Sequence, residues 1–269
     1  MPVDHYENFP VASLLLPPRL RRPIEVIYRF ARAADDIADE GQASDAERLA
    51  GLAAYRAELD RIEAGHPPQR PEFSELAEII AAWQLPVQLL RDLLDAFAQD
   101  VSKKRYADYT ELLDYCRRSA NPVGRLLLHL FGRTEAIHLA RSDAICTALQ
   151  LVNFWQDIAL DWQKGRVYLP QDELARFAID EAQIAAGKWD EPWATLLDAQ
   201  LGRARRLLED GAPLVHALPG RLGWEIRLTV QGGLRIAERI AAVRGDVFRQ
   251  RPVLKGLDWL VMLGRALRM

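Results

Sequence analysis

Hydrophobic residues recur three and four positions apart along nearly the whole chain, which is the period of an amphipathic helix. No segment shows the strict alternation of a half-buried strand. Proline and glycine mark short breaks between the helical stretches, at residues 16–23, 64–71, 165–171, 187–192 and 211–223. None of these breaks is composed like a flexible linker, and no internal repeat is visible. The pattern therefore predicts an all-α chain whose residues 1–269 form a single domain.

One predicted helix, residues 24–41, places polar side chains along a single face. Tyr28, Arg32, Asp35 and Asp39 follow one another at steps of four, three and four, so they project from the same side of the helix. Because Arg32 could also pair with Asp36 one turn later, a purely structural role for these acids stays open.

A second predicted helix, residues 145–162, is mostly apolar but carries one narrow polar stripe. Gln150, Asn153, Asp157 and Asp161 form this stripe at steps of three, four and four. Carboxylates in apolar surroundings are costly unless a positive charge neutralises them, and the segment contains no Arg or Lys. Either arginines from elsewhere in the chain or metal cations must therefore lie against this stripe.

Paired aspartates four residues apart are suited to Mg²⁺, which prefers hard oxygen ligands and is usually held by few carboxylates together with substrate phosphates. The expected substrate is therefore a diphosphate. Lys164, Arg166 and Tyr168 follow the second stripe directly, and Gly165 interrupts the helix between them. The two cations could bind diphosphate oxygens, or they could simply complement the dipole at a helix C-terminus.

The composition narrows the class of protein. A net charge of −3 without a polybasic stretch makes nucleic acid an unexpected partner. Cys116 and Cys146 stand alone in apolar surroundings, so we expect reduced thiols and a cytoplasmic location, without a signal peptide or a spanning helix. Residues 255–269 mix large apolar side chains with three basic ones; this segment could rest on a membrane surface, but a helix packed on the core is the preferred interpretation.

Four ordered segments together resemble the squalene/phytoene synthase family of trans-isoprenyl diphosphate synthases: IYRFARAADDIADEG, KKRYADYTELLDYCRRSANPVG, LVNFWQDIALDWQKGRVYLP and RGDVFRQRP. The resemblance implies the all-α isoprenoid synthase fold, a helical bundle around a central apolar cavity. It also implies a Mg²⁺ cluster that binds a prenyl diphosphate. The implied metal ligands are Asp35, Asp39, Asn153, Asp157 and Asp161. The implied catalytic residues are Tyr28, Arg32, Tyr115, Asn121 and Tyr168. The implied substrate-binding residues are Phe9, Ser13, Arg32, Arg118, Phe154, Lys164 and Arg166.

Within this family, YENFPVASLLLP at residues 6–17 and SANPVG at residues 119–124 are similar to the branch that converts presqualene diphosphate to hydroxysqualene. The alternative is a head-to-head condensing synthase that uses farnesyl or geranylgeranyl diphosphate. In the first branch water ends the reaction, and we expect Tyr115, Arg118 and Asn121 to help position it. Phe30, Phe131 and Trp155 are further candidates to line the apolar cavity, although ordinary core packing is the commoner role of helical aromatics.

Overall fold

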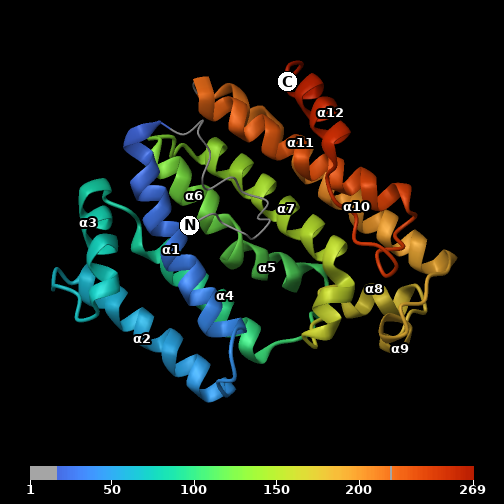
Figure 1. Ribbon diagram of the computed structural model, residues 1–269, viewed down its shortest axis with the longest axis horizontal. Coiled ribbons are helices and arrows are strands. Elements are labelled where there is room, and N and C mark those ends of the chain that lie inside the picture. The colour runs from blue at the N-terminus through green and yellow to red at the C-terminus, as the bar shows by residue number, and fades with distance from the viewer. Residues whose placement is uncertain (1–16, 219) are drawn as a thin grey trace. The chain divides into compact units, whose positions relative to one another are not determined.

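The computed structural model describes residues 17–218 and 220–269, and Figure 1 shows their elements. Within these ranges every regular element is helical, and the single extended feature is an isolated parallel bridge between Arg105 and Val167. The α-helices are α1 (Pro18–Asp39), α2 (Asp45–Glu63), α3 (Ser74–Trp83), α4 (Val87–Ser102), α5 (Tyr109–Ser119), α6 (Asn121–Leu130), α7 (Ala136–Gln163), α8 (Gln171–Arg176), α9 (Glu181–Ala185), α10 (Glu191–Gly211), α11 (Gly220–Ala242) and α12 (Gly256–Ala266). Two 3₁₀ helices, η1 (Pro71–Phe73) and η2 (Ala212–His216), complete the set. The all-α prediction is confirmed for this part of the chain.

The described residues group into two compact units. The first unit comprises residues 17–103 and 117–139, and the second unit comprises residues 104–116, 140–218 and 220–269. Helices α5 and α7 contribute residues to both. The expectation that the whole chain forms one domain stays a prediction.

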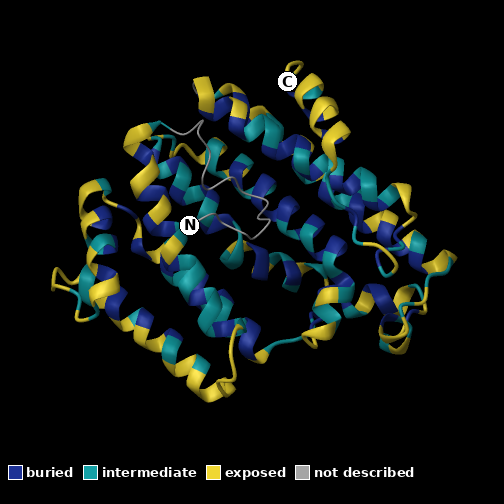
Figure 2. Cartoon of the chain, viewed as in Figure 1, coloured by how far each residue is buried: buried dark blue, intermediate teal, exposed yellow. Residues whose placement is uncertain are grey.

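In the first unit, α1 and α2 pack on α4, and α1 also contacts α3 and α6. The buried side of α1 carries Leu20, Ile24, Ile27 and Phe30, which join the core of this unit. Figure 2 shows the result as dark blue turns along one side of each helix. The polar residues of α1 are thereby left on another side of the helix.

In the second unit, α11 packs on α10 and on α12. Helix α7 approaches α10 closely at Gly211, where an added Cβ would lie 2.5 Å from Ile145 Cγ1 and 2.7 Å from the Arg141 carbonyl oxygen. A similar approach occurs at Gly233 of α11, where a Cβ would meet Leu149 at 2.7 Å. These glycines therefore let two helices lie directly against α7.

Most of the predicted breaks are confirmed, because α2, α7 and α9 end at Glu63, Gln163 and Ala185, one or two residues before the predicted breaks at 64–71, 165–171 and 187–192. The break at residues 16–23 is wrong in part. Helix α1 already begins at Pro18, and Pro23 lies inside it, buried in its second turn, where a proline removes one backbone hydrogen bond without ending the helix.

The break at residues 211–223 is also too long, since α11 begins at Gly220 and includes Gly223. At Gly223 a Cβ would lie 2.7 Å from the Leu218 carbonyl oxygen. This glycine therefore permits close packing and does not terminate a helix.

Among the helices formed by residues 17–218 and 220–269, none combines the length and the apolar character that crossing a membrane requires.

Candidate active site

The acidic stripe of the first unit lies along α1. Tyr28, Arg32, Asp35 and Asp39 are all half-buried on one side of this helix, as their spacing predicts. Arg32 pairs with Asp36 at 2.8 Å between Nη2 and Oδ1, and its Nη1 lies 3.4 Å from Asp35 Oδ2. The pairing with Asp36 that sequence left open is therefore present, and the same guanidinium also contacts the first aspartate of the stripe.

The acidic stripe of the second unit lies along α7. Gln150, Asn153, Asp157 and Asp161 are half-buried, whereas most of the residues between them are buried. The stripe is therefore more accessible than most of the side chains between its members, as the sequence pattern indicates.

Asp157 has a positive partner from a distant part of the chain. Arg251 donates to it in a bidentate pair, through Nε to Oδ1 and through Nη2 to Oδ2, the latter at 3.1 Å. The neighbouring Gln156 is buried and donates to the Pro252 carbonyl oxygen, so the segment around Arg251 is fixed along α7. Arg251 is not among the predicted site residues, although it lies in RGDVFRQRP, one of the four segments that carry the resemblance.

The turn after α7 brings the predicted cations back toward its last aspartate. Gly165 has a φ of +73°, a left-handed conformation that favours glycine, and it lets the chain reverse. The backbone N–H groups of Lys164 and Arg166 both donate to the Asp161 carbonyl oxygen, at 3.0 and 2.8 Å. The Lys164 side chain is exposed and Arg166 is buried, so the two cations do not occupy equivalent positions.

Three of the predicted aromatic site residues meet in one buried cluster of the second unit. Phe154 and Tyr168 stack face to face, with ring centroids 3.7 Å apart and an interplanar angle of 9°. Tyr115 lies 5.8 Å from Tyr168 and 6.1 Å from Phe154, measured between centroids. Tyr106, which is not among the predicted site residues, stacks on Tyr168 and is tilted against Tyr115; it directly follows the basic run at residues 103–105.

Residues of different predicted roles share a small cavity beside this cluster. Asp161, Arg166, Phe154 and Tyr168 all line it, and its volume of about 10 Å³ is comparable to the space of one water molecule. A carboxylate, a guanidinium and two aromatic faces therefore converge at the end of α7.

Two other predicted residues lie in the first unit. Arg118 donates through Nη2 to Gln99 Oε1 at 2.6 Å, and Asn121 is buried at the start of α6. Tyr115 lies three residues before Arg118 on α5, in the part of this helix that belongs to the second unit. A joint role of these three residues stays a prediction. Phe9 and Ser13 fall outside the described residues.

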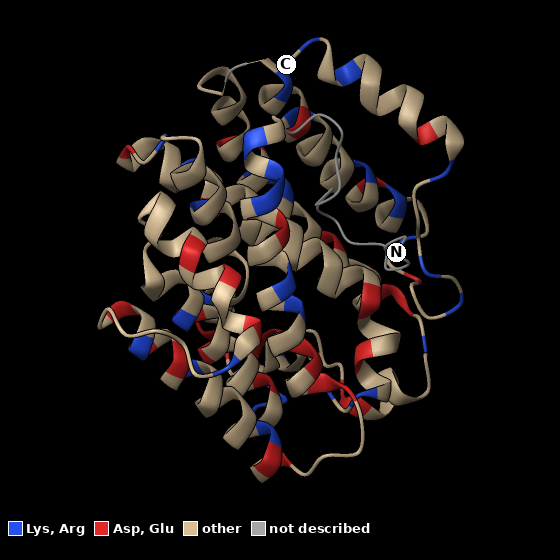
Figure 3. Cartoon of the chain, turned by 60° about the vertical axis from the view of Figure 1, so that its left-hand side comes forward, with Lys and Arg blue, Asp and Glu red and all other residues tan. Residues whose placement is uncertain are grey.

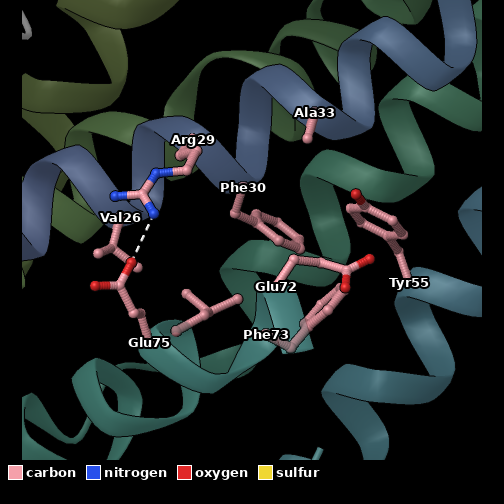
Figure 4. Close-up of a pocket in the computed structure, with 9 residues that line it drawn as sticks. Val26, Arg29, Phe30, Ala33, Tyr55, Glu72, Phe73 and Glu75 are labelled. Atoms are coloured by element: carbon pink, nitrogen blue, oxygen red, sulfur yellow. Dashed lines mark hydrogen bonds and ion pairs between the residues drawn. The ribbon is translucent and has the colours of Figure 1, made fainter. Parts of the chain in front are cut away.

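The first unit also contains a pocket of about 130 Å³, which Figure 4 shows in close-up. Phe30, Tyr55 and Phe73 form its apolar wall, and Arg29 pairs with Glu75 at 2.6 Å at its rim. Phe30 lies about 200° around α1 from Tyr28, on the side away from the acidic stripe. Phe30 packs against Tyr55 and Phe73 in the core of this unit and at the same time lines the pocket.

The side-chain oxygens of each stripe suit Mg²⁺, which proteins often bind with a few carboxylates together with phosphates of the substrate. Among the described residues, no group of three or more His, Cys, Asp and Glu side chains is arranged as a complete protein-only metal site. Each stripe instead offers two aspartates on one helix face, and Asn153 adds an amide oxygen in α7. Metal binding itself stays a prediction.

Comparisons with known proteins agree with this architecture. The family model for squalene/phytoene synthases matches residues 3–258. The chain is 35% identical over 258 residues to the hydroxysqualene synthase of Sinorhizobium fredii, covering 95% of this chain and 86% of that protein. It is 31% identical over 264 residues to the phytoene synthase of Arthrospira platensis, covering 92% and 84%.

A solved structure shows the same fold. The crystal structure of squalene synthase HpnC from Alicyclobacillus acidocaldarius superimposes with a TM-score of 0.82 at 37% identity, covering 89% of this chain and 90% of that one. The chain therefore belongs to the squalene/phytoene synthase family, and the all-α isoprenoid synthase fold is confirmed.

Proposed function

We propose that the protein is a Mg²⁺-dependent enzyme that converts presqualene diphosphate to hydroxysqualene and releases diphosphate. The observation that carries this proposal is the convergence of Asp161, Arg166, Phe154 and Tyr168 on one cavity at the end of the α7 stripe. The similarity to hydroxysqualene synthases, over nearly the full length of the chain, supports the choice of substrate.

In this proposal both acidic stripes serve the same diphosphate. Asp35 and Asp39 of α1 and Asn153, Asp157 and Asp161 of α7 would hold Mg²⁺, which neutralises phosphate oxygens and makes the diphosphate a better leaving group. Arg32, Lys164 and Arg166 bind oxygens of the departing diphosphate and stabilise its developing charge.

Cleavage of the bond between carbon and the diphosphate oxygen leaves the electron pair on diphosphate and a cation on the prenyl chain. The faces of Phe154, Tyr168 and Tyr115 offer negative π density to that cation, and their packing keeps bulk water away from it. After rearrangement one water molecule adds through its oxygen to the cationic carbon and loses a proton, which gives the hydroxylated product. Tyr28, Tyr115, Arg118 and Asn121 are the proposed groups that position substrate and water.

The test is product analysis with purified protein and Mg²⁺. The chain is incubated with presqualene diphosphate and, separately, with farnesyl diphosphate, each with and without NADPH. We expect hydroxysqualene from presqualene diphosphate alone, with no requirement for NADPH. Consumption of farnesyl diphosphate as the sole substrate would overturn the assignment.

The second candidate is a head-to-head condensing synthase. The comparison with phytoene synthases favours it, because they match the chain at about the same coverage as the hydroxysqualene synthases. In that case farnesyl or geranylgeranyl diphosphate is consumed pairwise, and the incubations above distinguish the two activities.

A further inference from the structure

Helix α12 is fixed to α11 by one side. Asp258, Met262 and Ala266 are buried on this side. Asp258 accepts hydrogen bonds from Arg235 and Arg239 of α11, each at 2.7 Å, and Arg265 pairs with Glu238 at 2.6 Å. The helix is therefore held in place without help from its other side.

The other side of α12 is apolar and open. Leu257, Leu260 and Leu267 are 76%, 67% and 69% exposed. Trp259, Val261 and Leu263 add to the same surface, which we call the α12 face. Figure 2 shows α12, next to the C label, with exposed yellow turns along its length. Single exposed apolar residues are common on soluble proteins, but five within one short helix and a sixth at its C-cap form a patch that marks an interaction site.

The C-terminal segment that contains the α12 face differs in net charge from the rest of the chain. Residues 220–269 contain ten Arg and Lys against four Asp and Glu, a net charge of +6, so the remaining residues carry −9 of the total of −3. Arg221, Lys255 and Arg268 are exposed within this segment. In Figure 3 α12 is largely tan, the colour of uncharged residues. The α12 face therefore belongs to a segment that is strongly basic, although the helix itself carries few charges.

We propose that the α12 face docks the protein on an anionic lipid surface. The apolar side chains enter the boundary between headgroups and acyl chains, and the exposed Lys255 and Arg268, at the two ends of α12, attract anionic headgroups. A second copy of the chain is a poorer occupant, because a symmetric pairing through this face would bring two segments of net charge +6 together. A specific protein partner is also disfavoured, since Trp259 is the one member of the face whose side chain can donate a hydrogen bond.

This inference is independent of the proposed reaction, since it concerns binding alone. The test is co-sedimentation of the full chain with vesicles of phosphatidylcholine alone and of phosphatidylcholine with about 30% phosphatidylglycerol. We expect binding to the anionic vesicles, and weaker binding when NaCl is raised from about 0.1 M to about 0.5 M.

Two variants separate the apolar and the electrostatic contributions. Substituting all three leucines, Leu257→Ser, Leu260→Ser and Leu267→Ser, should weaken binding about tenfold or more. The pair Lys255→Glu and Arg268→Glu should remove the preference for anionic vesicles. The matched control is Leu49→Ser with Ile137→Ser, which removes exposed apolar side chains elsewhere and should bind like the unmodified protein. Circular dichroism and thermal unfolding check that each variant is folded.

Three results would overturn the proposal. The first is no sedimentation of the unmodified protein with anionic vesicles. The second is equal binding by the triple leucine variant. The third is a dimer in analytical ultracentrifugation that the triple variant abolishes, without vesicle binding, since this would assign the α12 face to a second copy.

Discussion

The guanidinium of Arg251 already neutralises Asp157, so a metal ion that binds this carboxylate has to compete with an arginine. We predict that Arg251→Ala lowers the free energy of unfolding by about 1–3 kcal/mol, because a half-buried carboxylate loses a bidentate partner. Added Mg²⁺ should then raise the melting temperature of this variant more than that of the unmodified protein. Calorimetry with and without Mg²⁺ measures both effects.

Arg249→Ala is the matched control for this measurement. Its side chain is 83% exposed and lies 3.3 Å from Asp246, so we expect little change in stability and none in the response to Mg²⁺. Equal Mg²⁺ responses in Arg251→Ala and the unmodified protein would show that Asp157 takes no cation.

The two stripes can be tested for a shared role through the kinetics of single and double variants. Asp35→Asn and Asp161→Asn should each reduce kcat by about a thousandfold or more while leaving the circular dichroism spectrum unchanged, since neither residue belongs to the buried core. If both aspartates serve one diphosphate, the double variant should be little worse than either single one. Multiplicative losses would instead indicate independent roles.

At the residue scale, sequence spacing predicted which side chains share a helix face, and the half-buried stripes of α1 and α7 agree with it. It could not predict Arg251, because an ion pair between residues 94 positions apart depends on tertiary packing and not on local periodicity. Tyr106 was missed for the same reason, since Tyr168, on which it stacks, comes from another segment.

Among the elements, the contact between α10 and α7 depends on the absence of a side chain at one position. Gly211→Ala should lower the free energy of unfolding by about 1–3 kcal/mol, because the new Cβ collides with Ile145 and with the Arg141 carbonyl group. Gly202→Ala in the same helix is the control. Its Cβ would make an ordinary contact at 3.6 Å with the flexible end of Arg206, so alanine should be neutral or slightly stabilising. Urea unfolding measures the free energy of unfolding of both variants. Equal values would contradict the close approach of α10 to α7 at Gly211.

The attachment of α12 to α11 should depend on pH through Asp258. Burial opposes ionisation of this carboxyl group, but the backbone N–H of Lys255 and the guanidiniums of Arg239 and Arg235 outweigh burial and lower its pKa to about 2. Because the folded-state pKa lies below the ordinary value of 3.8, ionised Asp258 stabilises the fold above pH 3.8. That contribution, about 2 kcal/mol, is lost as the pH falls from about 4 through about 2.

Asp258→Asn should therefore be less stable than the unmodified protein at neutral pH, and the difference should shrink below about pH 4. Urea unfolding at a series of pH values measures it. Asp45→Asn is the control, because Asp45 is exposed and lacks a comparable set of arginine partners among the described residues. If Asp258→Asn differed from the unmodified protein by the same free energy at every acid pH, the role given to ionised Asp258 would be refuted.

Helix boundaries were predictable from proline and glycine wherever these residues end a helix. The predicted boundaries were wrong at Pro23 and Gly223, because these two residues lie inside a helix. A single sequence does not distinguish a terminating glycine from one that admits a neighbouring backbone, because both look alike in local composition.

For the molecule as a whole, the two cysteines report global unfolding. Neither forms a disulfide and both are buried, as sequence predicted, and burial raises the pKa of the Cys116 thiol, which keeps it protonated and unreactive. We predict that a disulfide reagent such as Ellman's reagent labels neither thiol in the native protein and both in urea. Rapid labelling under native conditions would show that one of these sites opens locally.

The all-α class followed from the helical period of the apolar residues, and the family followed from four separated segments that matched in order. Sequence did not establish in the same way how the two units are arranged, which metal binds or which substrate is used. Each of these depends on atoms that distant segments or ligands contribute. The α12 face shows the same limit, because the periodicity of residues 255–269 predicts a helix but not which of its sides α11 leaves uncovered.

The close approach at Gly211 has a practical consequence for engineering. It secures α7 through Ile145, on a different side from Gln150, Asn153, Asp157 and Asp161. A library that randomises positions next to the stripe, while leaving that anchoring side unchanged, should therefore retain a high proportion of folded members. Selectivity among prenyl chains could then be reprogrammed without first rebuilding the scaffold.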